Sequence, residues 1–384
     1  MALLLTPEWD QGYTALAKAR AMGAEAVIAA LAAADLRGRG GAGFPAARKW
    51  ELARAAEGSV KHVVVNGGEH EPGSGKDRML VAQYPHRVLE GAAICALCTG
   101  ATSIVLYLIE DMHDAIEAAQ RAIAEAPLEG FEVRVVLAPT TYVAGEETAA
   151  LEVIEGKKAW PRKKPPYPGQ AGLYGQPTTV QNVETLAWVP GIVLHGPDWF
   201  RPGAMLCTLD ESFARPGIVE VPFGISLERL IADFGGGTRG GRPVKAILPA
   251  LSSAFLPASA LSLPLTHEAL RDAGSNLGCG GFSVLEEGQC IVERALQIAE
   301  FFKAEQCGQC PPCRMETNTI AAVFQKVATG QPGDYVAQLE KITAFARGKG
   351  YCSLIEMAAA PALSAVRLFP EDFASHARTG LCPA

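Results

Sequence analysis

Four cysteines have a spacing that suits metal chemistry. The stretch CGQCPPCR places Cys307, Cys310 and Cys313 at regular intervals, and Cys352 follows after 38 intervening residues. Three thiolates in such a run, completed by a distant fourth, are typical of [4Fe–4S] ligation. Structural zinc more often uses two separated cysteine pairs, or pairs with histidine. The spacing therefore favours an iron–sulfur cluster, with zinc or plain thiols as the alternatives.

The remaining six cysteines show no such pattern. Cys95 and Cys98 form a CxxC motif, but they lie in an apolar stretch with no partner pair. We interpret them as core thiols, and likewise Cys207, Cys279, Cys290 and Cys382. The start of the chain, MALLLTPEWDQ, has no basic region and only a short apolar run, so we expect no secretory signal. Without one, a disulfide framework is not expected.

A glycine-rich stretch, RGRGGAGFPAARK, spans Arg37 to Lys49. Glycine reaches positive φ cheaply and lets a backbone approach a ligand closely. Pro45 suits the first turn of a helix, and a glycine loop that leads into a helix N-terminus is suited to phosphate or another anion. The spacing matches neither GxGxxG nor the P-loop motif, so a tight turn between two helices remains an equal alternative.

Four glutamates lie in other glycine-bearing loops of the first half: Glu69, Glu71, Glu146 and Glu147. Any one of them is most simply explained as a solvated carboxylate. Two acidic loops together with a glycine loop favour a single ligand site in this half of the chain.

Composition sets the outer limits. The chain has 384 residues, which predicts two or three domains, and its net charge of −7 gives no indication of nucleic-acid binding. The segment from Gly91 to Ile109 is uncharged and nearly long enough to span a membrane. Thr99, Gly100, Thr102 and Ser103 interrupt it, so a buried helix followed by a buried strand explains it better.

Strands and helices are predicted to alternate up to about residue 190. The expected strands are 62–66, 103–109 and 131–137, and the expected helices are 11–34 (one or two), 79–97, 111–126, 147–155 and 181–189. Such alternation indicates an α/β layer with a mostly parallel sheet. The basic, proline-rich stretch 157–179 is long for a structureless loop, and such loops are usually functional or disordered.

The pattern changes near residue 205. Short strands at 205–207, 217–221 and 244–248, with a helix at 226–234, predict a small α+β unit up to about residue 285. From residue 291 the pattern is helical to the end, broken by the cysteine segment and by the loop around Cys352.

Several long motifs, in order, resemble one family. They are GRGGAGFP, an N-x-x-E-x-EPG-x-x-KDR loop, GEETA, KPPYP with GQPTTVQNVETL, and CGQCPPCR with a distant CSL. Together they resemble the NADH-oxidising flavoprotein subunit of respiratory complex I and the related diaphorase subunits of NAD-dependent formate dehydrogenases and hydrogenases. The resemblance runs from about residue 12 to residue 375.

The resemblance implies an α/β plus α architecture in three domains. A Rossmann-like domain for FMN and NADH would occupy 1–203, a β-grasp domain of the soluble-ligand-binding type 204–287, and a helical domain with one [4Fe–4S] cluster 288–384.

The resemblance also implies a set of contact residues. FMN would be held by the glycine loop and by residues further along the first half of the chain, namely Gly38, Arg39, Gly40, Gly41, Ala42, Gly43, Lys49, Asn66, Glu69, Tyr142, Gly145, Glu146, Gln181 and Asn182. NADH would stack on the flavin, with Phe44 and Tyr167 near the adenine, Lys164 near the phosphates, and Glu71 and Glu147 tuning the nicotinamide end. Cys307, Cys310, Cys313 and Cys352 would hold the cluster.

Three contact positions depart from the family pattern. Gly68 stands where the family usually has an aspartate, Gln181 replaces the first of two asparagines, and Leu52 replaces a second adenine-side phenylalanine. Loss of a carboxylate at position 68 predicts weaker flavin binding. It also motivates a rival hypothesis, in which the chain is an electron-transfer or scaffold subunit with a cluster but no working flavin or NADH site.

The leading hypothesis is an NADH:acceptor oxidoreductase in which a hydride passes to FMN and single electrons then pass to the cluster, or the reverse. One cluster motif implies that electrons leave through partners, namely a small thioredoxin-like [2Fe–2S] subunit and a larger iron–sulfur, molybdenum, tungsten or hydrogenase subunit. No nucleic acid and no membrane insertion are expected. The expected location is the cytoplasm or the cytoplasmic face of a membrane complex, and the parent complex is left open.

Overall fold

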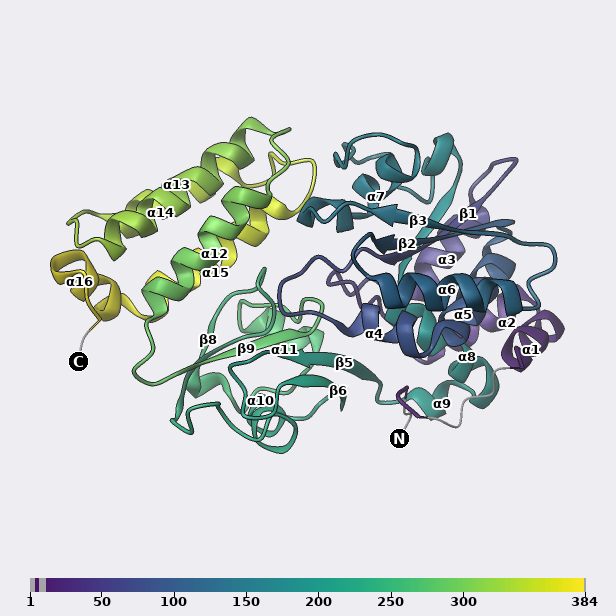
Figure 1. Cartoon of the computed structure of the whole chain (residues 1–384), viewed down its shortest axis with the longest axis horizontal. Coiled ribbons are helices and arrows are strands. Elements are labelled where there is room, and N and C mark those ends of the chain that lie inside the picture. The colour runs from purple at the N-terminus through teal and green to yellow at the C-terminus, as the bar shows by residue number, and fades with distance from the viewer. Residues whose placement is uncertain (1–3, 7–11, 383–384) are drawn as a thin grey trace. The chain divides into compact units, whose positions relative to one another are not determined.

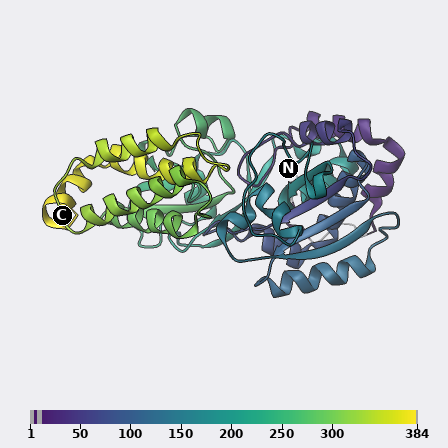
Figure 2. The same ribbon diagram turned by 90° about the horizontal axis from the view of Figure 1, so that it is seen from above.

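The computed structural model describes residues 4–6 and 12–382, which form two compact units (Figures 1 and 2). The first unit holds the described residues up to His70, Ser74–Cys207 and Glu220–Phe223, and the second holds Glu71–Gly73, Thr208–Val219 and the residues from Gly224 onward. The change of unit near residue 207 lies close to the first predicted domain boundary. The division into three domains itself stays a prediction.

A four-stranded parallel sheet forms the centre of the first unit, in the order β3-β2-β1-β4. Its strands are β1 (His62–Gly67), β2 (Ser103–Ile109), β3 (Glu132–Ala138) and β4 (Thr178–Asn182). β2 is buried along its whole length, as expected of an uninterrupted apolar run in a sheet covered on both faces. The three predicted strands are confirmed within one residue or so, whereas β4 was not predicted.

Helices surround this sheet. They are α1 (Thr14–Met22), α2 (Ala24–Ala33), α3 (Ala46–Ala55), α4 (Lys76–Gln83), α5 (Pro85–Thr99), α6 (His113–Glu125), α7 (Glu147–Ile154), α8 (Val183–His195) and α9 (Pro197–Phe200), with 3₁₀ turns η1 (Tyr142–Gly145) and η2 (Leu173–Gly175). The single helix predicted over 79–97 is two helices, because Pro85 has no N–H to continue α4 and instead begins α5.

The uncharged segment from Gly91 to Ile109 folds as predicted, into the end of α5 followed by β2. α5 is almost completely buried, and it packs against α8, α3 and the sheet. Within the described residues, no helix is long and apolar enough to cross a membrane.

A mixed five-stranded sheet follows, in the order β6-β5-β9-β7-β8. It contains β5 (Ala204–Leu209), β6 (Gly217–Pro222), β7 (Val244–Leu248), β8 (Leu256–Pro257) and β9 (Gly281–Glu286), with short helices α10 (Leu227–Arg229), η3 (Leu230–Phe234), η4 (Ala258–Ala260) and α11 (His267–Asp272). β5 and β9 run parallel in the centre, and β7 is antiparallel to both β9 and β8. This strand order is that of a β-grasp sheet, so the predicted fold class is confirmed.

The C-terminal part is helical, as predicted. It consists of α12 (Ile291–Glu305), α13 (Pro311–Ala328), α14 (Tyr335–Ala346), α15 (Leu354–Leu368) and α16 (Pro370–Thr379). α12 to α15 form a bundle in which each helix packs on its neighbours around buried side chains such as Phe302, Ile320, Phe324 and Leu339. α16 packs across α13 near one end of the bundle (Figure 1).

The packing of α5 on α8 depends on Gly91. A Cβ atom at this position would collide with the carbonyl oxygen of Leu186, which is backbone and cannot rotate away. We therefore expect Gly91→Ala to lower the free energy of unfolding by about 2–3 kcal/mol, because overpacking outweighs the better helix propensity of alanine. Chemical denaturation of both proteins measures this.

Gly169→Ala is the matched control, because no atom lies within 4 Å of the Cβ it would add. Its stability should stay within about 0.5 kcal/mol of the wild type, as for other surface substitutions. A Gly91→Ala protein as stable as this control would contradict the packing argument.

Candidate functional site

Polar side chains gather where β1 and β4 end. Asn66 is the partner of Asn182 in the parallel register of these strands, and Gln181 precedes Asn182 on β4. The chain builds the sheet outward from β1 to β3 and then returns to the other side of β1 with β4. In open α/β sheets, ligands bind at the carboxyl ends of strands where the order reverses in this way. The topology thus marks this edge as the ligand site.

The glycine loop closes over the same edge. Arg37 and Pro45 form an isolated antiparallel bridge, and the Gly38 N–H donates to the Phe44 carbonyl at 2.9 Å. A Cβ on Gly40 would lie 3.3 Å from the Cβ of Asn182. Gly41 and Gly43 have φ of 107° and 62°, which side-chain-bearing residues rarely adopt. The loop is therefore a tight turn that leads into α3, and its binding of a phosphate or another anion stays a prediction.

A third segment is fixed to this edge. The Asn66 side-chain amide donates to the Gly145 carbonyl at 2.9 Å, and the Tyr107 hydroxyl donates to the Ala144 carbonyl at 3.1 Å. η1, with Tyr142 at its start, is thereby held against the end of β1. Three of the predicted flavin-contacting segments therefore meet in one place.

Close contacts of the backbone explain why position 68 is a glycine. A Cβ there would lie 3.1 Å from Asn66 Oδ1 and 3.2 Å from both Gly145 Cα and the Tyr107 ring. A Cβ on Gly145 would in turn lie 2.5 Å from the Gly68 carbonyl oxygen. The two backbones approach so closely that an aspartate at position 68 would have to push them apart.

Two lysines converge on Glu147. Lys49 Nζ lies 3.3 Å from one oxygen of this carboxylate and Lys164 Nζ lies 3.2 Å from the other. Burial favours the neutral acid, but the two lysines outweigh it and lower the pKa of Glu147. Glu146 accepts from Lys164 at 2.9 Å and also from the N–H groups of Thr148 and Ala149, so it caps α7. The predicted residues of this group are thus brought together, and Glu147 is ionised at neutral pH.

Two residues predicted to contact the cofactor have their side chains engaged within the protein. The Arg39 guanidinium is buried, donates to the carbonyls of Arg37 and Ala204, and lies 3.8 Å from Glu184. The Glu69 carboxylate caps α4 by accepting from the N–H groups of Asp77 and Arg78. Burial, with Asp77 nearby, raises the pKa of Glu69 to about 7.

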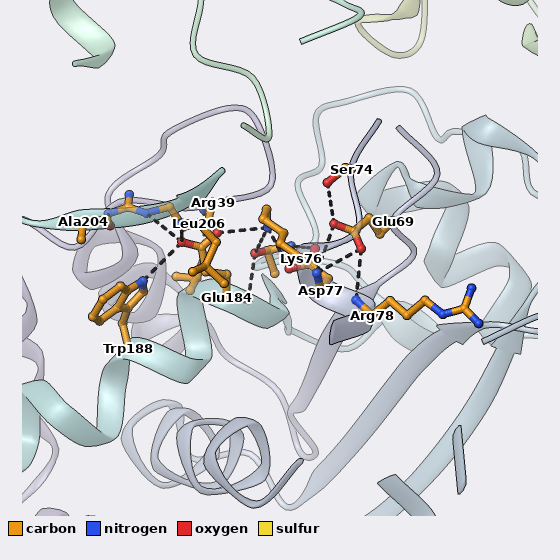
Figure 3. Close-up of polar contacts among 12 residues, drawn as sticks. Arg39, Glu69, Ser74, Lys76, Asp77, Arg78, Glu184, Trp188, Ala204 and Leu206 are labelled. Carbon is orange, nitrogen blue, oxygen red and sulfur yellow. Dashed lines mark hydrogen bonds and ion pairs between the residues drawn. The ribbon is translucent and has the colours of Figure 1, made fainter. Parts of the chain in front are cut away.

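Sequence reasoning missed a buried charge network beneath the glycine loop (Figure 3). The fully buried Lys76 ammonium lies 2.8 Å from Asp77 and 3.1 Å from Glu184. Thr185, the next residue, accepts the Arg39 N–H at 2.8 Å. The signal was present in the KDR and VETL motifs, which contain these residues but were not assigned a role.

Two aromatic side chains predicted for the adenine are exposed, Phe44 at 45% and Tyr167 at 56%. Leu52, at the third altered position, is 49% exposed. Glu71 groups with the second unit, where its carboxylate accepts from the N–H of Ser252 at 3.3 Å and the hydroxyl at 3.4 Å. The nicotinamide role of Glu71 therefore stays a prediction.

One buried atom at this edge fits a missing ligand. Gln181 is only 4% exposed, and its amide Nε2 has no hydrogen-bond partner among the described residues. An unmet buried donor costs about 1–3 kcal/mol, so such atoms usually have a partner in the functional state. A flavin supplies carbonyl and phosphate oxygens that would accept from it, so the residues present fit FMN.

The four cysteines of the predicted cluster meet between two helices of the second unit. Cys307 precedes α13, Cys310 is its N-cap residue, and Cys313 lies in its first turn. Cys352 lies in the turn before α15, and the neighbouring Tyr351 N–H points at the Cys310 sulfur, 3.4 Å away. Cys352 thus lies beside the segment that contains Cys307, Cys310 and Cys313.

The four thiols are close enough to influence one another electrostatically. Burial raises the pKa of Cys313 to about 12, with further contributions from Cys352, Glu316, Cys310 and Cys307. Bound iron reverses this effect, because its positive charge favours the thiolate. The N-terminus of α13 adds the positive end of a helix dipole, which suits an anionic cluster. The donor set fits a [4Fe–4S] cluster.

The prediction of core thiols holds for only some of the other cysteines. Cys95, Cys98 and Cys207 are buried. Cys279, Cys290 and Cys382 are only partly buried, so this part of the prediction is wrong. Cys290 and Cys382, far apart in sequence, both contact His376.

Comparison with known proteins decides the family. The Nuo51 FMN-binding domain matches residues 31–191, and the NADH-ubiquinone oxidoreductase-F iron–sulfur binding region matches residues 293–376. The second F subunit of NADH-quinone oxidoreductase from Rhizobium meliloti is 38% identical, over 99% of this chain and 96% of its own length. The chain belongs to the family of NADH-quinone oxidoreductase F subunits. The F subunit from Mycobacterium bovis is 36% identical, over 97% of this chain and 89% of its own.

A solved structure agrees with this assignment. A chain of the NAD⁺-reducing [NiFe]-hydrogenase in the H₂-reduced state superposes with a TM-score of 0.86 at 31% identity. It covers 99% of this chain, and this chain spans 66% of it. The predicted family, fold class and enzyme class are confirmed, and so are FMN, NAD(H) and a [4Fe–4S] cluster as cofactors. As a member of this family, the chain works with partner subunits.

The flavin site can be tested at Gly41. Valine is strained at φ 107° and would add a side chain where the backbone must approach the ligand. We expect Gly41→Val to reduce bound flavin at least tenfold, measured as fluorescence of released flavin after gel filtration. Gly130→Val is the control, because φ there is 92°, in the loop between α6 and β3. Stoichiometric flavin in Gly41→Val would contradict the site.

The cluster site can be tested at Cys352. We expect Cys352→Ser to lose about four irons per chain and to loosen the helical bundle, because ligation energy is also folding energy. Iron analysis with thermal unfolding measures both effects. Cys279→Ser should keep its iron. If Cys352→Ser also retains full iron, the fourth ligand has been assigned wrongly.

Proposed function

We propose that this NADH-oxidising module holds its flavin at the carboxyl edge of β1 and β4, with the glycine loop, Asn66, η1 and the Gln181–Asn182 pair as the contacts. This proposal is supported by three features that occur together at one edge of the sheet. These are the reversal of strand order, the left-handed glycines of the loop, and the unpaired buried amide of Gln181.

The charged residues beside this edge would position the nicotinamide nucleotide. Glu147 is held between Lys49 and Lys164, so its orientation is fixed before any ligand arrives. We assign Lys164 to the nucleotide phosphates, which would replace its contact with Glu146. The exposed rings of Phe44 and Tyr167 offer apolar faces for the adenine. Glu71 is assigned to the nicotinamide end on the family resemblance.

Bound FMN accepts two electrons as a hydride and releases electrons singly, which the side chains of this site do not do. The protein's part is to orient the nucleotide and to keep an ionised carboxylate beside it. In the second unit, Cys307, Cys310, Cys313 and Cys352 would hold the cluster through which electrons continue. Glu147 and Lys49 act by charge and position, with no side-chain nucleophile required.

The partners we propose follow from a single cluster in this chain. A small thioredoxin-like [2Fe–2S] subunit and a larger catalytic subunit would receive the electrons. A solved relative described as an NAD⁺-reducing hydrogenase, together with relatives named as quinone oxidoreductase subunits, supports such an assembly. We place the complex in the cytoplasm or at the cytoplasmic face of a membrane.

Anaerobic titration with nicotinamide nucleotides tests the function. NADH should bleach the flavin absorption of the purified protein and then reduce the cluster. We expect kcat/KM for NADPH to be at least about tenfold lower than for NADH. A 2′-phosphate needs a free cation to bind it, and such a charged hydrogen bond contributes roughly 1.5–3 kcal/mol. In the basic stretch, Lys157 and Arg162 already form ion pairs with Glu152 and Glu155, so these two cations are engaged within the protein.

Two outcomes would contradict these assignments. Comparable kcat/KM for NADH and NADPH would refute the proposed preference. Absence of flavin in the wild-type protein after incubation with FMN would favour the rival hypothesis of an electron-transfer or scaffold subunit.

The Glu147→Gln variant separates nucleotide positioning from flavin binding. We expect it to keep its flavin but to lose reduction of that flavin by NADH.

A further inference from the structure

The C-terminal unit contains a second set of metal-ligating side chains. His376 Nε2 lies 3.2 Å from the sulfur of Cys290 and 3.2 Å from the sulfur of Cys382. The three ligand atoms all lie within 4.8 Å of one another. Cys290 is the N-cap residue of α12, His376 lies on α16, and Cys382 follows the end of α16. Two parts of the chain that are far apart in sequence therefore converge on one point.

This set is distinct from the iron–sulfur ligands. The match to the iron–sulfur binding region covers residues 293–376, which excludes both Cys290 and Cys382. Cys290 stands at the start of α12, whereas Cys307 follows its end. A helix of 15 residues is about 22 Å long at the usual rise, so the two sites lie at opposite ends of α12.

The geometry is close to that of a bound ion. Tetrahedral zinc with usual bond lengths places a cysteine sulfur about 3.6 Å from a histidine nitrogen. Both sulfur–nitrogen distances here are 3.2 Å, so small side-chain rotations would open room for an ion. A single ion also suits three ligand atoms this close together, whereas a cubane needs more widely spaced thiolates.

The imidazole is poised for a ligand. His376 is 4% exposed, and its Nε2 faces both sulfurs while its Nδ1 has no hydrogen-bond partner among the described residues. The imidazole is thus already oriented with Nε2 toward both sulfurs, as a shared metal ion would require. The neighbouring carboxylate, Asp372, forms an ion pair with Lys245, which leaves it satisfied without the metal.

We propose that Cys290, His376 and Cys382 bind one Zn²⁺ ion, with water in the fourth position. Two thiolates and an imidazole are soft and borderline ligands that select zinc over calcium or magnesium. Two thiolates neutralise the charge of the ion, so the ion can be held in this partly buried position. The zinc fastens the segment after α16 to the start of α12, and it acts as a structural staple independent of electron transfer.

Metal analysis of the flavin- and cluster-loaded protein tests the proposal. The wild type, purified anaerobically and equilibrated with ZnSO₄, should contain about one zinc beside about four irons per chain. Cys290→Ser and Cys382→Ser should each lose the zinc and keep the iron and flavin. Cys279→Ser, a partly buried cysteine outside the set, should keep all three.

Cobalt provides a readout that does not depend on the variants folding. Titration of the wild type with CoCl₂ should produce thiolate-to-cobalt absorption at about one equivalent, and ZnSO₄ should abolish it. His376→Cys should still bind cobalt, with a changed spectrum, because a third thiolate replaces the imidazole.

Three results would overturn the proposal. The first is wild-type protein with full iron but no zinc or cobalt binding. The second is zinc retained in both serine variants, which would place the ion elsewhere. The third is a Cys290–Cys382 disulfide found by peptide mapping of anaerobically purified protein, which would make the pair a redox bridge.

Discussion

The first unit depends on how a fully buried lysine is neutralised. The Lys76 ammonium has no exposed surface and is flanked by Asp77 and Glu184. Burial opposes its charge, but Asp77, Glu184 and Glu69 outweigh this and raise its pKa. Removal of one partner from a buried pair costs about 3–5 kcal/mol, because the remaining charge is left uncompensated. Loss of any one charged member would therefore destabilise the whole network.

The network fixes the parts that line the flavin edge. Glu184 and Thr185 lie in the first turn of α8, directly after β4, and they hold Arg39 of the glycine loop. Asp77 accepts from Asn182, so the beginning of α4 is tied to the end of β4. Loop, strand end and helix start are thus mutually constrained, so the backbone around the proposed flavin site is set before any cofactor binds. Such preorganisation lowers the cost of binding.

The sequence predicted elements with strong periodicity and missed those without it. The apolar runs of β1 and β2 were found, because strands buried on both faces are continuous and hydrophobic. β4 reads TTVQN, in which the β-branched residues suit a strand, but the run is short, mostly polar and followed directly by a helix, so its apolar pattern was too weak to predict it. Long motifs predicted the flavin loop and the cluster cysteines, and these assignments stay predictions. The KDR and VETL motifs contained members of the charge network, but their pairing depends on tertiary folding, as does the meeting of Cys290 with His376 and Cys382.

The unpaired amide of Gln181 has a consequence for the life of the protein in the cell. This buried donor has no partner among the described residues, so if flavin accepts from it as proposed, the cofactor-free chain is less stable than the loaded one by about 1–3 kcal/mol for this atom. Ligands that bind only the native state shift the folding equilibrium, and proteases remove chains that open often. Flavin supply would thereby control the abundance of the chain, so that copies lacking FMN are cleared before they enter an assembly they could not serve.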